Sequence, residues 1–366
     1  MKTTISLPRL ASFLFFLCMN TAIVIGFSQF HEEQLLQYGL MFFAALFLLF
    51  KYVITNDISL KNILISLFFI GIAFASYFYT RRLTLFQIVL YVLAAKNLNL
   101  EDILKFNIAS LVIATGFIFF TSLIGVTDKY YFDASKAALR LGFANPNTVA
   151  VIMFSILASY NLIRKSKPSF KTIGLDFLYI IFCYFVFKSR SELVAGIIYI
   201  LILALVQNIS GKGLFYKILF PFQYSFLAGT ILIGYILEKY DSFSSTWNEL
   251  NFLLSGRLFY WHAFLDYYGI KLFGNRIVDE TMPLDNGYIF LLIYQGVILL
   301  LLMNYIYIYV SRYAYMTKNK TLLVTIFAYA FYCAAETAPL YFNLSPIGLI
   351  FAQLIMNRNN TIQKAR

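Results

Sequence analysis

Long apolar runs, separated by short polar stretches, fill most of the chain. A helix of about 20 mostly apolar residues crosses a bilayer core about 30 Å thick, and counting such runs predicts about twelve transmembrane helices. The sequence therefore predicts an all-α integral membrane protein, with residues 1–366 as one polytopic domain. The expected helices cover residues 10–28, 35–54, 62–79, 83–96, 103–125, 148–163, 172–187, 193–207, 217–237, 287–310, 321–338 and 345–357.

The composition supports this class and excludes others. Apolar residues make up 61% of the chain and charged residues 13%, and the mean hydropathy is +0.75. No stretch is polar enough for a separate soluble catalytic domain, which excludes cytosolic enzymes and nucleic-acid readers. The three cysteines lie in apolar runs without a Cys-x-x-Cys motif or a Cys/His cluster, and no Asp-x-Asp pair occurs. We therefore expect neither a metal nor a cofactor.

The formal net charge of +12 is unevenly distributed. Lysines gather in alternate connections, which the positive-inside trend assigns to the cytoplasm, and acidic residues gather mostly in the others. Both termini are therefore predicted to be cytoplasmic. Arginine departs from the trend, because six arginines fall on the expected outer side: Arg81, Arg82, Arg140, Arg190, Arg257 and Arg276.

A guanidinium is a planar fork that matches phosphate oxygens and stays charged at any relevant pH. Six of them at one face, each near an apolar span, favour a diphosphate site. Pairing with outer acids or with lipid headgroups explains any single one of them equally well.

Two expected outer connections are long enough to suggest a function. In the first, residues 127–147, a glycine and the turn Asn145-Pro146-Asn147 let the backbone re-enter a helix, with Asn147 or Thr148 as its expected cap. A turn with a good cap, without further function, explains the same residues.

The second long connection, residues 238–286, is predicted to contain two short helices. Thr246 to Glu249 matches a capping box ahead of a helix over 250–254, and Ser255 to Tyr268 has the pattern of an amphipathic helix. An interfacial helix within an ordinary aromatic belt is the simpler interpretation.

On the second of these helices, pairs of residues four apart share a face. Arg257 and Trp261 would place a cation beside an aromatic platform, an arrangement that suits a phosphorylated, sugar-bearing ligand. His262 and Asp266 share a neighbouring face. His262 by itself is a weak signal and is as well explained by a structural role.

Two acidic residues lie where the expected tenth and eleventh helices meet the outer surface. Asp285 opens the tenth helix, and Glu336 lies in the apolar end of the eleventh, where an ionised group is costly unless it is paired or functional. A purely structural explanation of Glu336 is that it pairs with an outer arginine.

In chain order, five short motifs resemble those of the Wzy-type polymerases of capsule, O-antigen and exopolysaccharide pathways. Together with the helix count and the late outer loop, the resemblance covers nearly the full length. The motifs are Arg140-x-Gly142 with Asn145-Pro-Asn147, Ser189-Arg190, Ser255-Gly-Arg257 with Trp261, Phe273-Gly274, and Asp285-Asn286-Gly-Tyr288.

This resemblance implies the O-antigen ligase and polymerase superfamily, with a helical architecture of the GT-C type in the bacterial cytoplasmic membrane. Its members act on glycans linked to undecaprenyl diphosphate at the outer face of that membrane. Outer arginines hold the lipid diphosphate, a role that passes to Arg140, Arg190 and Arg257 by motif and to Arg276 by position. The implied partners are the lipid-linked oligosaccharide, membrane lipid and a chain-length regulator, and nucleic acid is not among them.

The implied activity is a metal-independent, inverting glycosyl transfer. A hydroxyl of the incoming repeat attacks the anomeric carbon of the growing glycan, cations stabilise the diphosphate that leaves, and one carboxylate accepts the proton. The candidate bases are Asp285, then Glu336, then Asp266 or His262, and the residues expected at the glycan are Trp261, Asn286 and Tyr288.

Three alternatives stay open. The ligase branch has a His-Asn pair where this chain has Asp285-Asn286, which argues against lipid A ligation. A flippase or transporter of lipid-linked sugars also needs many helices, but internal repeats and midplane charges are not evident. Another GT-C transferase would use an acid of the first outer loop, Glu32 or Glu33, where no metal-binding pattern occurs.

Overall fold

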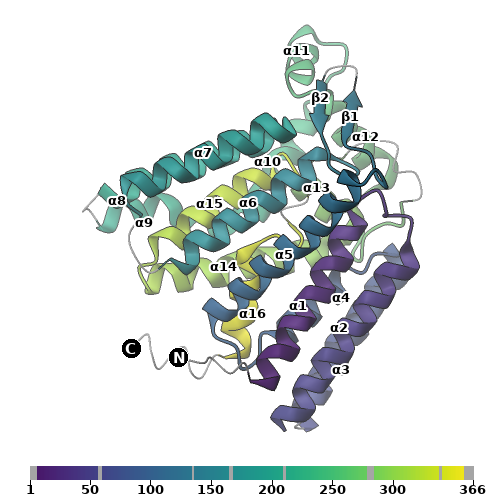
Figure 1. The fold of residues 1–366 in the computed structure, drawn as a ribbon. Helices are drawn as coiled ribbons and strands as arrows, with labels where there is room; N and C mark the ends of the chain where they lie inside the picture. Colours follow the sequence, from purple (N-terminus) through teal and green to yellow (C-terminus); the bar gives the residue numbers. More distant parts are fainter. Residues whose placement is uncertain are drawn as a thin grey trace. The chain divides into compact units, whose positions relative to one another are not determined.

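The computed structural model describes residues 6–56, 60–133, 136–164, 168–208, 212–277, 284–337 and 340–357. The chain forms two compact units that interleave in sequence (Figure 1). Unit 1 contains Met1–Leu67, Gln87–Ser210 and Phe342–Arg366, and unit 2 contains Phe68–Phe86 and Gly211–Tyr341.

Helices account for nearly all regular structure in the described ranges, and each of the twelve predicted apolar segments coincides with one or more of them. The helices are α1 (Leu7–Gly26), α2 (Gln34–Thr55), α3 (Leu60–Thr80), α4 (Thr84–Ala94), α5 (Leu100–Leu123), α6 (Pro146–Ile163), α7 (Phe170–Phe187), α8 (Arg190–Asn208), α9 (Lys212–Leu219), η1 (Phe220–Tyr224), α10 (Ser225–Glu238), α11 (Ser245–Leu253), α12 (Arg257–Tyr268), α13 (Gly287–Phe290), η2 (Leu291–Gln295), α14 (Gly296–Met316), α15 (Lys320–Cys333) and α16 (Pro346–Met356).

Seven helical segments of the described chain are long and apolar enough to cross a membrane. Four shorter apolar helices, within α3, α4, α15 and α16, fall below that length. The structure is therefore that of an all-α membrane protein, and the total of about twelve spans stays a prediction. The seven segments are Leu7–Gly26, Gln34–Thr55, Leu100–Leu123, Pro146–Ile163, Phe170–Phe187, Phe215–Glu238 and Gly287–Met316.

Unit 1 is organised by α1, which packs against α2 and α5. Polar side chains inside this apolar group satisfy one another: Asn20 donates to Asn107 (2.9 Å) and accepts from the hydroxyl of Tyr91 (2.5 Å), and Asn107 donates to the carbonyl of Asn343 (2.8 Å). Because buried polar groups without partners are costly, this network fixes the register of α1 against α5 and the segment before α16.

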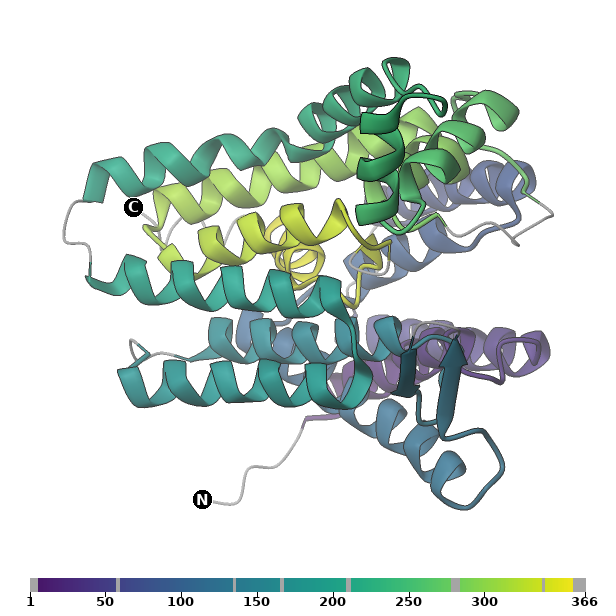
Figure 2. The same ribbon diagram turned by 90° about the horizontal axis from the view of Figure 1, so that it is seen from above.

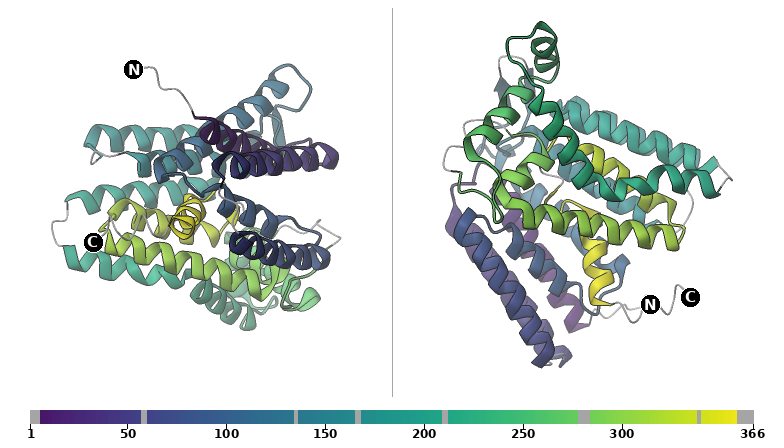
Figure 3. Two further views of the ribbon diagram at one scale, coloured as in Figure 1. Left: turned by 90° about the horizontal axis from the view of Figure 1, so that it is seen from below. Right: turned by 180° about the vertical axis from the view of Figure 1, so that it is seen from behind.

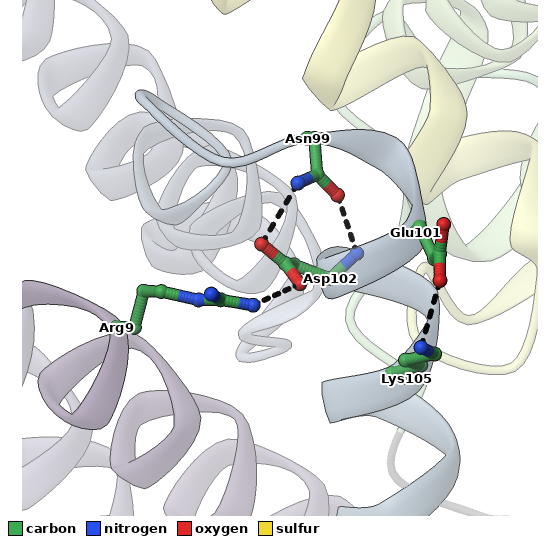
Figure 4. Close-up of polar contacts among 5 residues, drawn as sticks. All are labelled: Arg9, Asn99, Glu101, Asp102 and Lys105. Carbon is green, nitrogen blue, oxygen red and sulfur yellow. Dashed lines mark hydrogen bonds and ion pairs between the residues drawn. The ribbon is translucent and has the colours of Figure 1, made fainter. Parts of the chain in front are cut away.

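One end of unit 1 is joined by charges. Arg9 at the start of α1 pairs with Asp102 in the first turn of α5, and Asn99 caps that helix by accepting from the Asp102 amide (2.8 Å) (Figure 4). Lys51 is buried and donates to the carbonyls of Ala94 (2.7 Å) and Lys96 (2.6 Å). These contacts gather segments that the charge pattern assigns to one side of the membrane.

The other end of unit 1 joins two connections that are expected outside, the one after α1 and the one before α6. The Gln29 amide donates to the Gly142 carbonyl (2.9 Å), and Ser28 and Phe143 form an isolated β-bridge. A two-stranded antiparallel hairpin, β1 (Tyr130–Asp133) and β2 (Lys136–Leu139), projects from this connection (Figure 2). The sequence did not predict this hairpin. Helix α6 starts two residues earlier than expected, because Asn145 is its N-cap and accepts from the Asn147 amide (2.8 Å).

In unit 2, α14 packs against α10 and α15 (Figure 3). The ring of Phe226 on α10 lies 4.6 Å from that of Tyr307 on α14 and 5.2 Å from that of Tyr288 on α13. The predicted tenth span is not a regular helix, because the π-helix η2 separates α13 from α14. Such insertions are frequent at functional sites.

Candidate functional site

Helices α11 and α12 occupy the long connection between α10 and α13, as the sequence predicts. Their boundaries differ from the expectation. Helix α11 already begins at Ser245, and its N-cap, Ser244, makes no side-chain cap hydrogen bond, so the predicted capping box does not form. Ser255 (φ 56°) and Gly256 (φ 80°) adopt left-handed conformations that turn the chain into α12 directly before Arg257.

The structure brings together three of the predicted site residues: Arg257, Asp285 and Glu336, all in unit 2. The Nη2 atom of Arg257 lies 3.3 Å from Oδ2 of Asp285 and 3.8 Å from Oε1 of Glu336. Both ion pairs use the same nitrogen, and Nη1 and Nε make no ion pair with any residue that the structure describes. Two carboxylates therefore fix the guanidinium, while its other edge keeps N–H donors for a ligand.

The two carboxylates differ in accessibility. The Asp285 side chain is 35% exposed, whereas that of Glu336 is 7% exposed. A group that exchanges a proton with a ligand must be reachable, whereas a buried carboxylate is held by its charged partner. The arrangement favours Asp285 as the group that meets a ligand and Glu336 as the group that positions Arg257.

Hydrogen bonds between side chains and the backbone hold Asp285 next to Glu336. The side chain of Asn286 caps α13 by accepting from the amides of Tyr288 (3.0 Å) and Ile289 (3.1 Å), and it donates to the Ala334 carbonyl (3.0 Å). The Tyr288 hydroxyl donates to the carbonyl of Ala330. Asn286 and Tyr288 are buried and serve these structural contacts, and their predicted part in glycan binding stays a prediction.

Trp261 lies one turn beyond Arg257 on α12. Its side chain is buried, and its indole Nε1 has no hydrogen-bond partner among the described residues. An unsatisfied buried donor costs about 1–3 kcal/mol, which a ligand oxygen would relieve. On the neighbouring face, Nε2 of His262 lies 3.2 Å from Oδ2 of Asp266, which confirms that this pair shares a face. Both of those side chains are exposed by more than a third.

The other predicted diphosphate ligands belong to three other segments of the chain. In unit 1, Arg140 pairs with Asp128, and Arg190 is exposed as the first residue of α8. In unit 2, Arg276 is exposed after the buried Asn275. The pairing of Arg140 matches the structural alternative considered for a single outer arginine, and the shared diphosphate site stays a prediction.

The local sequence does not predict one contact of this region, that of Arg82 with Tyr294. Arg82, between α3 and α4, lies over the ring of Tyr294 in η2, with 4.5 Å between Cζ and the ring centroid. The motif Phe273-Gly274 is related to this region, because its backbone packs against η2. The Asn275 side chain donates to the Ile293 carbonyl (2.9 Å), a group within the π-helix.

Comparisons were made with family models, curated proteins and solved structures. None of the three finds a match for this chain. In the described ranges, no three His, Cys, Asp or Glu residues gather as metal ligands. Function is therefore argued from the residues themselves.

Proposed function

We propose that the chain is a polysaccharide polymerase that joins lipid-linked oligosaccharide repeats, with undecaprenyl diphosphate as the leaving group. The observation that carries the proposal is the position of Arg257 between Asp285 and Glu336, in a motif order that resembles the Wzy-type polymerases. The apolar helices around this site suit a substrate whose anchor stays in the membrane.

The reaction is a single displacement at the anomeric carbon of the growing glycan. The hydroxyl oxygen of the incoming repeat forms the new C–O bond, and its proton passes to the Asp285 carboxylate. The bond to the diphosphate oxygen breaks, and that oxygen leaves with the electron pair. Attack opposite the leaving group inverts the anomeric carbon.

Arg257 stabilises the leaving diphosphate. Its Nη2 edge is held by the two carboxylates, so Nη1 and Nε are oriented before the substrate arrives. Preorganised donors act where charge develops and need no reorganisation during the reaction. Trp261 offers its unpartnered Nε1–H to a sugar oxygen one helical turn away.

A transporter of lipid-linked sugars is the second candidate, and a specific observation in unit 1 favours it. Glu192 in the first turn of α8 is fully buried, and neither carboxyl oxygen has a hydrogen-bond partner in the described chain. Asp176 on α7 is also buried and accepts from Asn161 (3.0 Å). Buried carboxyl groups inside membrane helices are typical of proton-coupled carriers.

Reconstitution separates the two functions. Purified protein in liposomes receives lipid-linked repeats on its accessible face, and the products are resolved by size. A ladder of multiples of the repeat is expected for a polymerase. Movement of the unchanged lipid across the bilayer, without a ladder, would contradict the proposal and favour the transporter.

A further inference from the structure

The strongest feature outside the proposed catalytic group is Glu192, an acid in the first turn of α8 that is fully buried in unit 1. The spacing Ser189-x-x-Glu192 matches a capping box, in which the glutamate side chain accepts from the amide at the start of the helix. That contact does not form, because neither carboxyl oxygen of Glu192 has a hydrogen-bond partner in the described chain. Glu192 also makes no ion pair with any residue that the structure describes.

Helix α7 supplies the ionisable groups that face Glu192, the phenol of Tyr179 and the thiol of Cys183. Both are ordinarily uncharged near neutral pH. The Tyr179 hydroxyl donates to the carbonyl of Met153 on α6 (3.2 Å), so its hydrogen is directed away from Glu192. The side of α7 that packs against α8 therefore offers Glu192 neither a positive charge nor a free hydroxyl hydrogen.

The other neighbouring elements add no compensating charge. Helix α6, which also packs against α8, carries no charged residue from Pro146 to Ile163. Of the two cations in the turn between α7 and α8, Arg190 is exposed, and Nζ of Lys188 lies over the ring of Tyr184, 5.7 Å from its centroid. An ionised Glu192 would therefore be a buried charge without a partner.

A buried charge of this kind needs a cation. The first turn of a helix favours an anion, but only weakly compared with the cost of burying an unpaired carboxylate. A metal cation takes several oxygen ligands, and no three His, Cys, Asp or Glu residues gather for one in the described ranges. A proton needs a single oxygen and makes the group neutral. The ligand that suits Glu192 is therefore a proton.

The site lies near an aqueous surface but inside a closely packed pair of helices. Arg190, two residues before Glu192, is exposed on the side that is predicted to face outward. One turn after Glu192, a Cβ on Gly196 would lie 2.8 Å from the Ile180 side chain, so α8 packs tightly against α7. We propose that Glu192 is a proton-binding site, which holds a neutral carboxylic acid at neutral pH and exchanges its proton with the outer aqueous phase.

Loss of the proton leaves an unpaired negative charge between α7 and α8, so alkaline conditions weaken the packing of these helices. This inference concerns unit 1 and does not depend on the substrate proposed for Arg257. A ladder of glycan products neither supports nor contradicts it, and its failure leaves the proposed function unchanged.

Infrared spectroscopy detects the proton directly, because a neutral carboxylic acid and a carboxylate absorb in different bands. The spectrum of full-length Glu192→Gln protein in lipid nanodiscs is subtracted from that of the wild type. At neutral pH the difference should contain the carbonyl band of a neutral acid, which shifts in heavy water. Carboxylate bands in its place would overturn the inference.

Glu249→Gln is the matched control, since it makes the same substitution at an exposed position of α11. Its difference spectrum should contain carboxylate bands at neutral pH. Detection of the neutral-acid band for Glu249→Gln as well would overturn the assignment of that band to Glu192.

Equilibrium unfolding of the detergent-solubilised proteins is the second measurement. The unfolded chain hydrates Glu192 and lets it ionise, whereas the folded chain keeps it neutral. The unfolding constant of the wild type should therefore rise with pH, by up to about tenfold per pH unit, from mildly acidic to mildly alkaline conditions. Glu192→Gln should lack this rise, and Glu249→Gln should keep it.

The amide of Glu192→Gln is the neutral isostere of the acid, so this variant should fold. A Glu192→Gln protein that fails to fold, or that has the same pH dependence as the wild type, would overturn the inference.

Discussion

Arg257 and Asp285 form an ion pair of 3.3 Å in which the carboxylate is the more exposed partner. The two residues are 28 positions apart, and they meet because α12 packs against η2, the π-helix that follows α13. Glu336 approaches the same Nη2 atom from the end of α15 but is 7% exposed. One guanidinium is thus shared between a carboxylate that a ligand can reach and one that it cannot.

This difference predicts separate effects for the two acids. Asp285→Asn keeps the shape but removes the base, so elongation should fall by roughly 10²–10⁴-fold while lipid diphosphate binding persists. Glu336→Gln should lower elongation less and weaken diphosphate binding, because Arg257 loses a partner that orients it. Initial rates and binding, measured on purified variants, check both expectations. Wild-type turnover by Asp285→Asn would transfer the role of base to another acid.

The π-helix η2 depends on two glycines that approach it. A Cβ at Gly274 (φ 87°) would collide with the Tyr294 carbonyl oxygen, and one at Gly296 would collide with the Gly274 amide. Gly274→Ala should therefore lower the thermal transition of the detergent-solubilised protein and reduce elongation. Gly234→Ala on α10 is the control, since nothing lies within 4 Å of its Cβ and the helix favours alanine by about 0.5–1 kcal/mol. Equal shifts for both variants would contradict the packing argument.

The ion pair of Arg9 with Asp102 predicts a stability difference in unit 1 (Figure 4). The Asp102 side chain is 13% exposed and also accepts from the Asn99 side chain (3.0 Å). Asp102→Ala should lower the thermal transition of the protein, because it removes both contacts at the start of α5.

Glu101→Ala is the matched control for that change. Glu101 pairs with Lys105 on the exposed side of the same helical turn, and such pairs contribute only about 0.3–0.5 kcal/mol. A larger loss for Glu101→Ala than for Asp102→Ala would contradict the assigned roles.

The long apolar runs were enough to predict the positions of the helices, because each buried or lipid-facing helix needs such a run. It also predicted that His262 and Asp266 share a face of α12, since helical spacing alone decides this. The sequence indicates that Glu336 needs a charged partner on the outer side but does not identify which arginine it is. Arg257 lies 79 positions earlier in the chain, and only the fold brings the two together.

Other features depend on contacts that no local pattern encodes. The π-helix lies inside a long and mostly apolar segment, and the carbonyl of its residue Ile293 is satisfied by Asn275 from the preceding connection. Arg82 reaches Tyr294 across more than two hundred residues. The N-cap of α6 was placed too late, because the asparagine before the proline competes with the one after it, and only Asn145 has the extended conformation that a cap needs.

The measurement that tests the central claim most directly is glycan elongation by Arg257→Ala and Arg257→Lys proteins in liposomes supplied with lipid-linked repeats. Wild-type protein should give a ladder of repeat multiples. Arg257→Ala should give only the starting repeat. Arg257→Lys should give short products, because an ammonium keeps the charge but cannot contact the two carboxylates through one edge and the diphosphate through the other. Ladders of wild-type length from Arg257→Ala, in a protein that is inserted and folded, would contradict the proposal.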